Sequence, residues 1–172
     1  MKDSIEQMIK ELKSDMKIIA LQGKGGTGKT QCLQKLIYEI GKNNTITCLY
    51  PQNNFKFNEL IQNGDPVTKS NNNMVDFIVY GKIENKIVGI TTYGDDDDSL
   101  IDSFYKLKNY DCDLYICACR THGQTINLLK ELTLTGKLII HNRWAVNEEL
   151  FREKTLKYQI KEIYNEILYL LK

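Results

Sequence analysis

An eight-residue glycine-rich stretch, Gly23–Thr30, constrains the fold of this chain more than any other part of its sequence. It reads Gly-Lys-Gly-Gly-Thr-Gly-Lys-Thr and fits the phosphate-binding pattern G-x-x-x-x-G-K-[ST] at every fixed position. Residues 16–21 before it have the composition of a short buried strand, and residues 31–40 after it carry apolar side chains at helical spacing. In a strand, glycine loop and helix, backbone N–H groups and the helix N-terminus can bind phosphate oxygens. The sequence therefore predicts a site for a nucleoside triphosphate.

The residues of this stretch have separate expected roles. The glycines allow the backbone to turn its N–H groups inward. The Lys29 ammonium is expected to reach the outer phosphates, and the Thr30 hydroxyl is expected to ligand Mg²⁺. The residues expected to contact the nucleotide are Gly23, Lys24, Gly25, Gly26, Thr27, Gly28, Lys29, Thr30 and Gln31.

A second lysine, Lys24, stands early in the same stretch. With it, the loop resembles the deviant Walker A group of P-loop NTPases, which includes partition and septum-site ATPases. The resemblance is close over the loop and weak beyond it. It implies that Lys24 contacts phosphate across a nucleotide-bridged dimer. The alternative is a solvated loop lysine, because a cation beside phosphates needs no dimer to be useful.

The strand expected at residues 45–50 ends in a departure from that group. Its members carry Asp-x-Asp-Pro-Gln there, and the first aspartate helps to activate the attacking water. The matching residues here are Cys48-Leu49-Tyr50-Pro51-Gln52, so Pro-Gln is kept and both acids are absent. The family's usual route of hydrolysis therefore lacks its carboxylate at this position.

An acidic run follows a hairpin that we expect from strands at residues 76–80 and 86–92. The order of phosphate loop, helix and hairpin resembles that of small GTPases, in which the second strand of the hairpin ends in an aspartate directed at magnesium. Here the strand leads into Gly94 and four aspartates; Asp95 is our first choice for the carboxylate near the metal and Asp96 our second. Alternatively, the run only caps the next helix and lies in solvent.

Polar residues also follow the apolar run at residues 113–119, which is typical of a buried parallel strand. The carboxyl end of a central strand is a common place for ligand binding in α/β proteins. Arg120 is expected there to pair with phosphate or with a carboxylate substrate, or else to form a salt bridge with the aspartate run. His122 is a weaker candidate for a proton carrier.

The segment after the strand expected at residues 137–141 bears on base recognition. GTPases carry Asn-Lys-x-Asp at this point, whereas this chain has Asn142-Arg143-Trp144-Ala145. The base-reading aspartate is replaced by Ala145, so the sequence gives no case for GTP over ATP. Trp144 either stacks on a base or packs under the last helix, which is expected over residues 147–171.

Residues 53–75 form a long polar, asparagine-rich segment with a small helix expected near residues 57–61. It leaves a strand end on the side where open α/β sheets bind ligands. A connection this long is usually functional or disordered. We interpret it either as a mobile segment near the nucleotide or as a low-complexity insertion.

Composition narrows the function classes. The chain has 172 residues and a formal net charge of +1, so it lacks the basic excess typical of nucleic-acid binding. Its three arginines are too few for the arginine-rich lid of nucleotide phosphotransferases. Five cysteines without a C-x-x-C pair argue against a zinc site. Without a signal segment or a membrane-spanning stretch, we expect a cytoplasmic protein.

These observations predict one nucleotide-binding domain over residues 1–172. Its expected fold is a three-layer α/β P-loop NTPase-like domain, with a mostly parallel sheet, one antiparallel hairpin strand and helices on both faces. Its expected function is Mg²⁺-dependent binding of ATP, with GTP not excluded, as an NTPase or a nucleotide-dependent switch that acts through a homodimer or a protein partner. Lys29, Asp95 and Arg120 are the expected catalytic residues, and Thr30 and Asp95 the expected metal site.

Two other functions stay open at this point. One is a small-molecule kinase, in which the 53–75 segment and Arg120 hold an acceptor whose hydroxyl attacks the γ-phosphate. The other is a degenerate nucleotide-binding module without turnover, which the missing acids after the second strand suggest.

Overall fold

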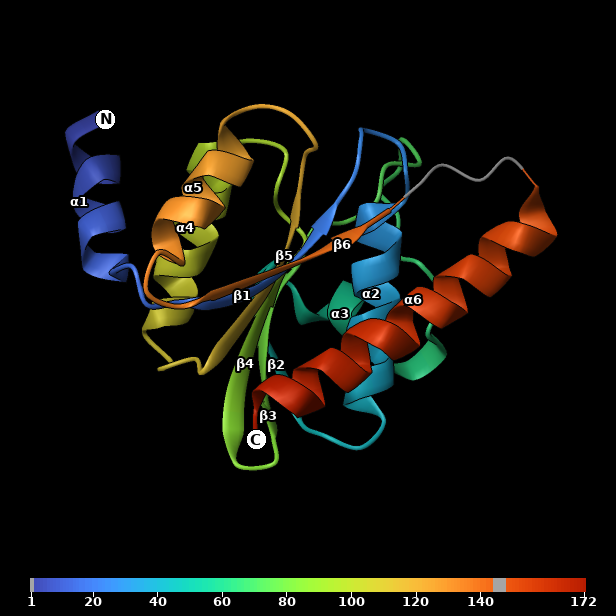
Figure 1. The fold of residues 1–172 in the computed structure, drawn as a ribbon. Helices are drawn as coiled ribbons and strands as arrows, with labels where there is room; N and C mark the ends of the chain where they lie inside the picture. Colours follow the sequence, from blue (N-terminus) through green and yellow to red (C-terminus); the bar gives the residue numbers. More distant parts are fainter. Residues whose placement is uncertain (1, 144–147) are drawn as a thin grey trace.

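The computed structural model describes residues 2–143 and 148–172, which form alternating strands and helices (Figure 1). In chain order the elements are α1 (Lys2–Leu12), β1 (Lys17–Gln22), α2 (Lys29–Gly41), β2 (Ile46–Tyr50), α3 (Asn54–Asn63), β3 (Ile78–Ile83), β4 (Lys86–Thr91), α4 (Asp97–Lys108), β5 (Leu114–Cys119), α5 (Gln124–Leu132), β6 (Lys137–Asn142) and α6 (Glu149–Leu170). The strands and helices expected from periodicity are present, with ends shifted by a few residues.

The strands form one sheet in the order β2-β3-β4-β5-β1-β6. Strand β3 is antiparallel to both of its neighbours, and the other neighbouring pairs are parallel. The reversal occurs at Glu84 and Asn85, whose φ values of 50° and 68° suit a tight hairpin turn. The predicted α/β fold, with a mostly parallel sheet and one antiparallel hairpin strand, is confirmed.

Two apolar cores lie on opposite faces of the sheet. Helices α2, α3 and α6 bury their apolar residues on one face, and α4 and α5 bury theirs on the other. Strand β5 is buried at all of its positions, as expected for a central parallel strand that is covered on both sides. The predicted placement of helices on both faces is therefore also confirmed.

Helix α1 packs mainly on α4 and lies at the outer edge of that layer (Figure 1). The Tyr105 hydroxyl donates a hydrogen bond to Glu11 (2.9 Å), and Lys108 forms an ion pair with the same carboxylate (3.7 Å). Leu12, with Ile5, Met8 and Ile9, also joins the apolar core on this face of the sheet, so the apolar side of α1 is covered by the fold.

The 53–75 segment is more ordered than its composition predicts. Helix α3 extends well beyond the short helix expected there, because the Asn53 side chain caps it by accepting from the Phe55 N–H (3.0 Å), and Gly64 ends it at a φ of 71°. Residues 67–75 then form a small hairpin, in which the Val75 N–H donates to the Val67 carbonyl (2.9 Å). The helix expected inside this segment is therefore present and longer than predicted, and a hairpin follows it.

Asparagines in that segment serve the turns. At the tip of the 67–75 hairpin, the Asn71 side chain accepts from the Asn73 N–H (3.2 Å), and Asn72 has a φ of 62°. Asparagine tolerates both roles better than most residues, because its short amide can replace a backbone partner. The asparagine content thus has a structural use.

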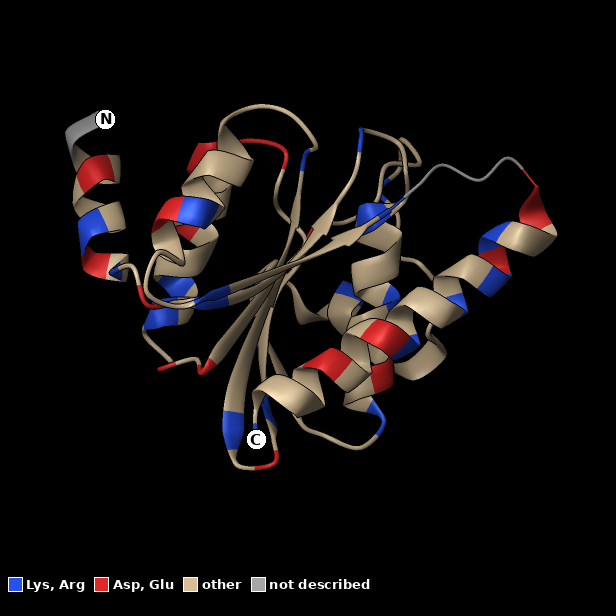
Figure 2. Ribbon diagram, viewed as in Figure 1, with Lys and Arg blue, Asp and Glu red and all other residues tan. Residues whose placement is uncertain are grey.

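Charges are mixed over the described elements. Acidic and basic residues alternate along α6 and are interspersed on the other helices (Figure 2). None of the described helices has the length and apolar character needed to cross a bilayer.

Candidate phosphate-binding site

The residues between β1 and α2 form a tight loop at the carboxyl edge of the sheet. Gly26 and Gly28 have φ values of 76° and 82°, a region that only glycine enters at little cost. Gly28 is also the N-cap of α2 and offers no side-chain acceptor to the first N–H groups of that helix. The loop and the helix N-terminus therefore present backbone donors with no side-chain cap, which is the condition for anion binding.

Lys29 is held inside this loop. Its side chain is 7% exposed, and its ammonium donates to the carbonyls of Gly23 (2.8 Å) and Lys24 (2.9 Å). The Thr27 hydroxyl donates to the same Lys24 carbonyl (2.8 Å), which fixes the loop from a second side. Burial lowers the pKa of Lys29, and the nearby Asp95 carboxylate partly offsets that effect.

A cleft of about 690 Å³ lies against the loop. It brings Lys29 and Thr30 together with Asp95, which follows β4. Strand β4 is not the neighbour of β1, because β5 lies between them. The residues that line the cleft are Gly25, Gly26, Gly28, Lys29, Thr30, Gln31, Lys69, Asn73, Met74, Asp76, Thr92, Tyr93, Gly94, Asp95, Asp96, Ser99 and Ala118.

Asp95 and Arg120 contact each other at this edge. The Arg120 Nε atom lies 3.2 Å from the Asp95 carboxylate, and both side chains are about half exposed or more. An ion pair with that exposure contributes little to stability. Both groups also act on the pKa of Lys29, in opposite directions, so the three charges lie close together. Arg120 itself is not among the residues that line the cleft.

Asp96 has a structural role that separates it from Asp95. Its carboxylate accepts hydrogen bonds from the Ser99 N–H (2.8 Å) and the Ser99 hydroxyl (3.0 Å), so Asp96 is the N-cap of α4. Asp97 and Asp98 lie in the first turn of that helix, where negative charge is favourable. Of the four aspartates, Asp95 is thus the one that lines the cleft without also capping α4.

The capping role gives a direct prediction. We expect Asp96→Ala to lower the free energy of unfolding by about 1 kcal/mol, because the first turn of α4 loses its acceptor. Asp96→Ser, which keeps a capping oxygen, should retain most of that stability. Urea unfolding of the two variants measures the difference, and equal losses in both would contradict the cap.

Asp76 is a third carboxylate in the cleft beside Asp95 and Asp96, and the sequence did not indicate it. It precedes β3, whose antiparallel direction places its start beside the end of β4. The Thr92 hydroxyl donates to Asp76 (2.8 Å) and accepts from the Phe77 N–H (2.9 Å), so the carboxylate is fixed. Burial raises the pKa of Asp76, while the Thr92 hydrogen bond and Lys69 act in the opposite direction.

The Cys48–Gln52 segment lies away from the glycine loop. Strand β2 is the edge strand, four strand spacings from β1, which is about 19 Å at the usual spacing. None of these residues lines the cleft. The segment that matches Asp-x-Asp-Pro-Gln is therefore separated from the loop by three strands of the sheet.

The other predicted residues fall outside the cleft. His122 is exposed and does not line it. Trp144 and Ala145 lie outside the described residues. Arg143 is 4% exposed and packs behind the loop near Gly28, with one guanidinium nitrogen donating to Gln159 (3.2 Å). Arg143 therefore packs against the glycine loop from the interior of the protein.

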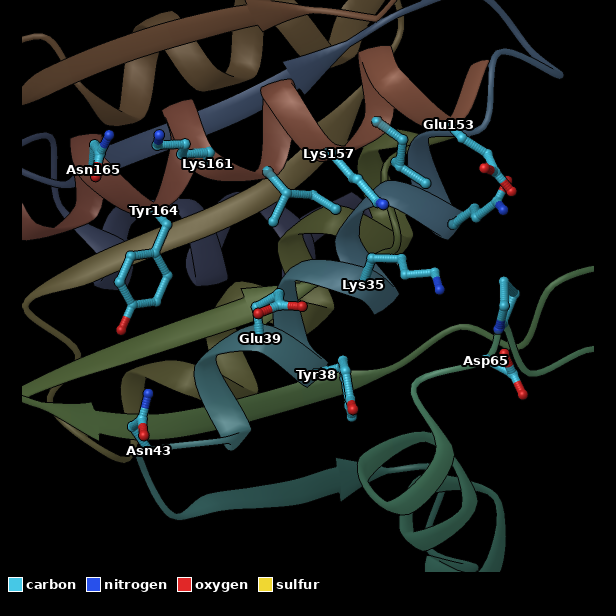
Figure 3. Close-up of a pocket in the computed structure, with 14 residues that line it drawn as sticks. Lys35, Tyr38, Glu39, Asn43, Asp65, Glu153, Lys157, Lys161, Tyr164 and Asn165 are labelled. Carbon is cyan, nitrogen blue, oxygen red and sulfur yellow. The ribbon is translucent and has the colours of Figure 1, made fainter. Parts of the chain in front are cut away.

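A second concave region, the α2–α6 groove, has a volume of about 720 Å³ (Figure 3). Lys35 of α2 and Lys157 of α6 extend toward the same space, but Glu39, Asp65 and Glu153 balance the lysines there. The groove contains none of the glycines of the loop, and it meets the cleft only at Gln31. The cleft, with its backbone donors, is therefore the better site for phosphate.

Comparison of the chain with protein-family models, with curated proteins and with solved structures finds no match. The functional argument consequently depends on the geometry of the cleft and on the residues that line it.

Proposed function

We propose that this chain is a Mg²⁺-dependent ATP-binding P-loop protein, and that it acts as an NTPase or a nucleotide-dependent switch. The observation that carries the proposal is the meeting of Lys29, Thr30 and Asp95 in one cleft beside the glycine loop. Backbone donors at the helix N-terminus suit phosphate oxygens, and a lysine at that position suits the outer phosphates.

Magnesium fits the oxygen donors of the cleft. Mg²⁺ prefers hydroxyl, carboxylate and phosphate oxygens and keeps several of its waters. In the proposed complex the Thr30 hydroxyl would be a direct ligand, and Asp95 would bind through a metal-bound water. The metal would neutralise charge on the outer phosphates. Arg120, now paired with Asp95, would then be available to a phosphate oxygen.

Lys29 provides the binding step on the protein side. Its ammonium donates hydrogen bonds to the carbonyls of Gly23 and Lys24, and both carbonyls are poorer acceptors than a phosphate oxygen. Phosphate oxygens would replace one or both of these partners without moving the backbone. ATP is the working choice for the nucleotide, because Ala145 replaces the aspartate with which GTPases read guanine, and GTP is the alternative.

A small-molecule kinase is the second candidate. The observation that favours it is the hairpin of residues 67–75, whose Lys69, Asn73 and Met74 line the cleft beside the loop. An acceptor could lie there, with its hydroxyl next to Asp76. A binding module without turnover is the third candidate, and it shares the same nucleotide site.

One experiment separates these candidates. Isothermal titration with Mg-ATP tests binding, and an assay of ATP turnover with and without a panel of small hydroxyl acceptors tests the reaction. An NTPase consumes ATP alone, a kinase only with its acceptor, and a binding module in neither case. Absence of Mg-ATP binding would overturn the proposal as a whole.

The carboxylate assignment has its own test. We expect Asp95→Asn to leave Mg²⁺-free nucleotide binding nearly unchanged and to weaken the Mg²⁺ dependence roughly tenfold, because an anionic group near the metal is lost. Titration of nucleotide affinity against Mg²⁺ measures this effect, with Asp96→Asn as the control. An effect of Asp96→Asn alone would assign the carboxylate near the metal to Asp96 instead of Asp95. If neither substitution has an effect, the aspartate run serves only to cap α4.

A further inference from the structure

The 67–75 hairpin is attached to the helix that follows the glycine loop. Gln34, in the second turn of α2, is fully buried and binds both arms of the hairpin. Its amide accepts from the Val67 N–H (2.8 Å) and donates to the carbonyls of Val67 (3.2 Å) and Val75 (2.8 Å). A buried amide with these partners holds the hairpin in a fixed position relative to α2.

This attachment directs one cation toward the cleft. Lys69 stands near the tip of the hairpin and lines the cleft together with Asn73 and Met74. Its ammonium makes no hydrogen bond or ion pair with another described residue. Asp76, held by Thr92, is close enough for Lys69 to affect its pKa, so the two charges face the same space. Lys69 is therefore a cation beside the cleft whose ammonium has no hydrogen-bond or ion-pair partner among the described residues.

A cation in this position would favour the negative charge of a bound nucleotide. In a P-loop site the inner phosphates lie against the loop and the N-terminus of α2, and the terminal phosphate lies farthest along the cleft. The cleft is lined by Lys29 of the loop and by the carboxylates Asp76, Asp95 and Asp96. These carboxylates would repel a terminal phosphate, and Lys69 adds a cation next to Asp76 that would offset this repulsion.

We infer that Lys69 contacts the terminal phosphate, and that the Gln34-bound hairpin lets this protein distinguish a nucleoside triphosphate from a diphosphate. The inference rests on the proposed function, since it assigns one side of the same site. Asp76 is a positioning residue in this arrangement, because its fixed carboxylate draws the Lys69 ammonium toward the cleft. Gln34 positions the same lysine through the backbone of the hairpin.

The test compares triphosphate and diphosphate binding. The probes are Mg-ADP and a slowly hydrolysed Mg-ATP analogue, measured by titration calorimetry on the full chain. For Lys69→Ala we expect affinity for the ATP analogue to fall about tenfold and affinity for ADP to change less than about twofold, because a charge-assisted contact is lost only with the terminal phosphate. Lys69→Arg should restore most of the lost affinity.

Lys82→Ala is the matched control. Lys82 is an exposed lysine on β3 near the hairpin turn, and it is not among the residues that line the cleft. The Lys82→Ala variant loses the same charge and should leave the affinities for the ATP analogue and for ADP unchanged. Wild-type binding of nucleotide with an unchanged ATP-to-ADP ratio in Lys69→Ala would overturn this inference alone. Failure of the wild-type chain to bind either nucleotide would overturn the proposed function, and the inference with it.

Discussion

Lys29→Ala is expected to lose affinity for Mg-ATP by about 100-fold, because a buried charge-assisted contact to the outer phosphates disappears. The ammonium is already desolvated and fixed at the loop, so phosphate binding needs little rearrangement of this side chain. Titration calorimetry with Mg-ATP measures the loss. Lys29→Met, which fills nearly the same volume without the charge, should behave like Lys29→Ala and separates charge from packing.

Lys35→Ala provides the control for that result. Lys35 lies in the second turn of the same helix, and it lines the α2–α6 groove but not the cleft. It removes one positive charge from α2 and should leave Mg-ATP affinity within about twofold of wild type, because solvent screens charges at that separation. Unchanged Mg-ATP affinity in Lys29→Ala would refute phosphate binding at the loop. An equal loss of affinity in Lys35→Ala would show that the effect comes from net charge and not from a contact of Lys29.

The parts of this fold that depend on local pattern could be predicted from the sequence. Strand β5 is apolar at nearly every position, and that pattern occurs where a parallel strand is covered on both faces. The glycine loop could be predicted because its φ values and its backbone donors demand glycine at fixed spacing. The place of Asp95 at the cleft could be predicted because an acidic run follows shortly after an apolar strand.

The order of the strands could not be predicted in the same way. The sequence places the Pro51–Gln52 segment next after the glycine loop and its helix, yet β2 lies at the edge of the sheet. Sequence neighbours often become neighbours in space, but the insertion of β3 and β4 between β2 and β5 depends on long-range pairing. The motif comparison therefore matches residues that do not line the cleft.

Asp76 and Lys69 were missed for a related reason. Both stand in or beside a polar segment whose composition suggests a loop, and neither belongs to a motif. Asp76 is placed by β3 and Thr92, whereas the place of Lys69 depends on Gln34, a polar residue on the buried face of α2. In a sequence, such a residue interrupts an apolar stripe, and only its hydrogen bonds to Val67 and Val75 show that it organises the segment. A buried amide opposite an asparagine-rich segment is the signal that could have indicated this contact.

The arrangement of Lys24 is compatible with a role toward a second molecule. Its side chain is exposed, whereas its carbonyl accepts from both Lys29 and Thr27. The backbone of Lys24 is therefore fixed by the loop, while its ammonium makes no hydrogen bond or ion pair with another described residue. For the proposed nucleotide site, an exposed lysine ammonium on a fixed backbone suits a contact across a two-fold interface, where the partner's nucleotide would supply the negative charge.

We therefore expect wild-type protein to be a monomer without nucleotide and a dimer with a slowly hydrolysed Mg-ATP analogue, since phosphates at the interface stabilise the dimer by linkage. Lys24→Ala should abolish that dimer and weaken monomer binding of ATP by less than about threefold, because Lys29 still binds the phosphates. Light scattering with and without the analogue measures both states, and Lys82→Ala, which removes an equal charge elsewhere, should still dimerise.

A mass that is independent of nucleotide, in wild type and variants alike, would exclude the bridged dimer. It would favour the kinase, in which Lys24 would affect only affinity or turnover. The dimer and the Lys69 inference are independent, because Lys69 acts on the terminal phosphate within one chain and should change the ATP-to-ADP ratio even in a protein that never dimerises.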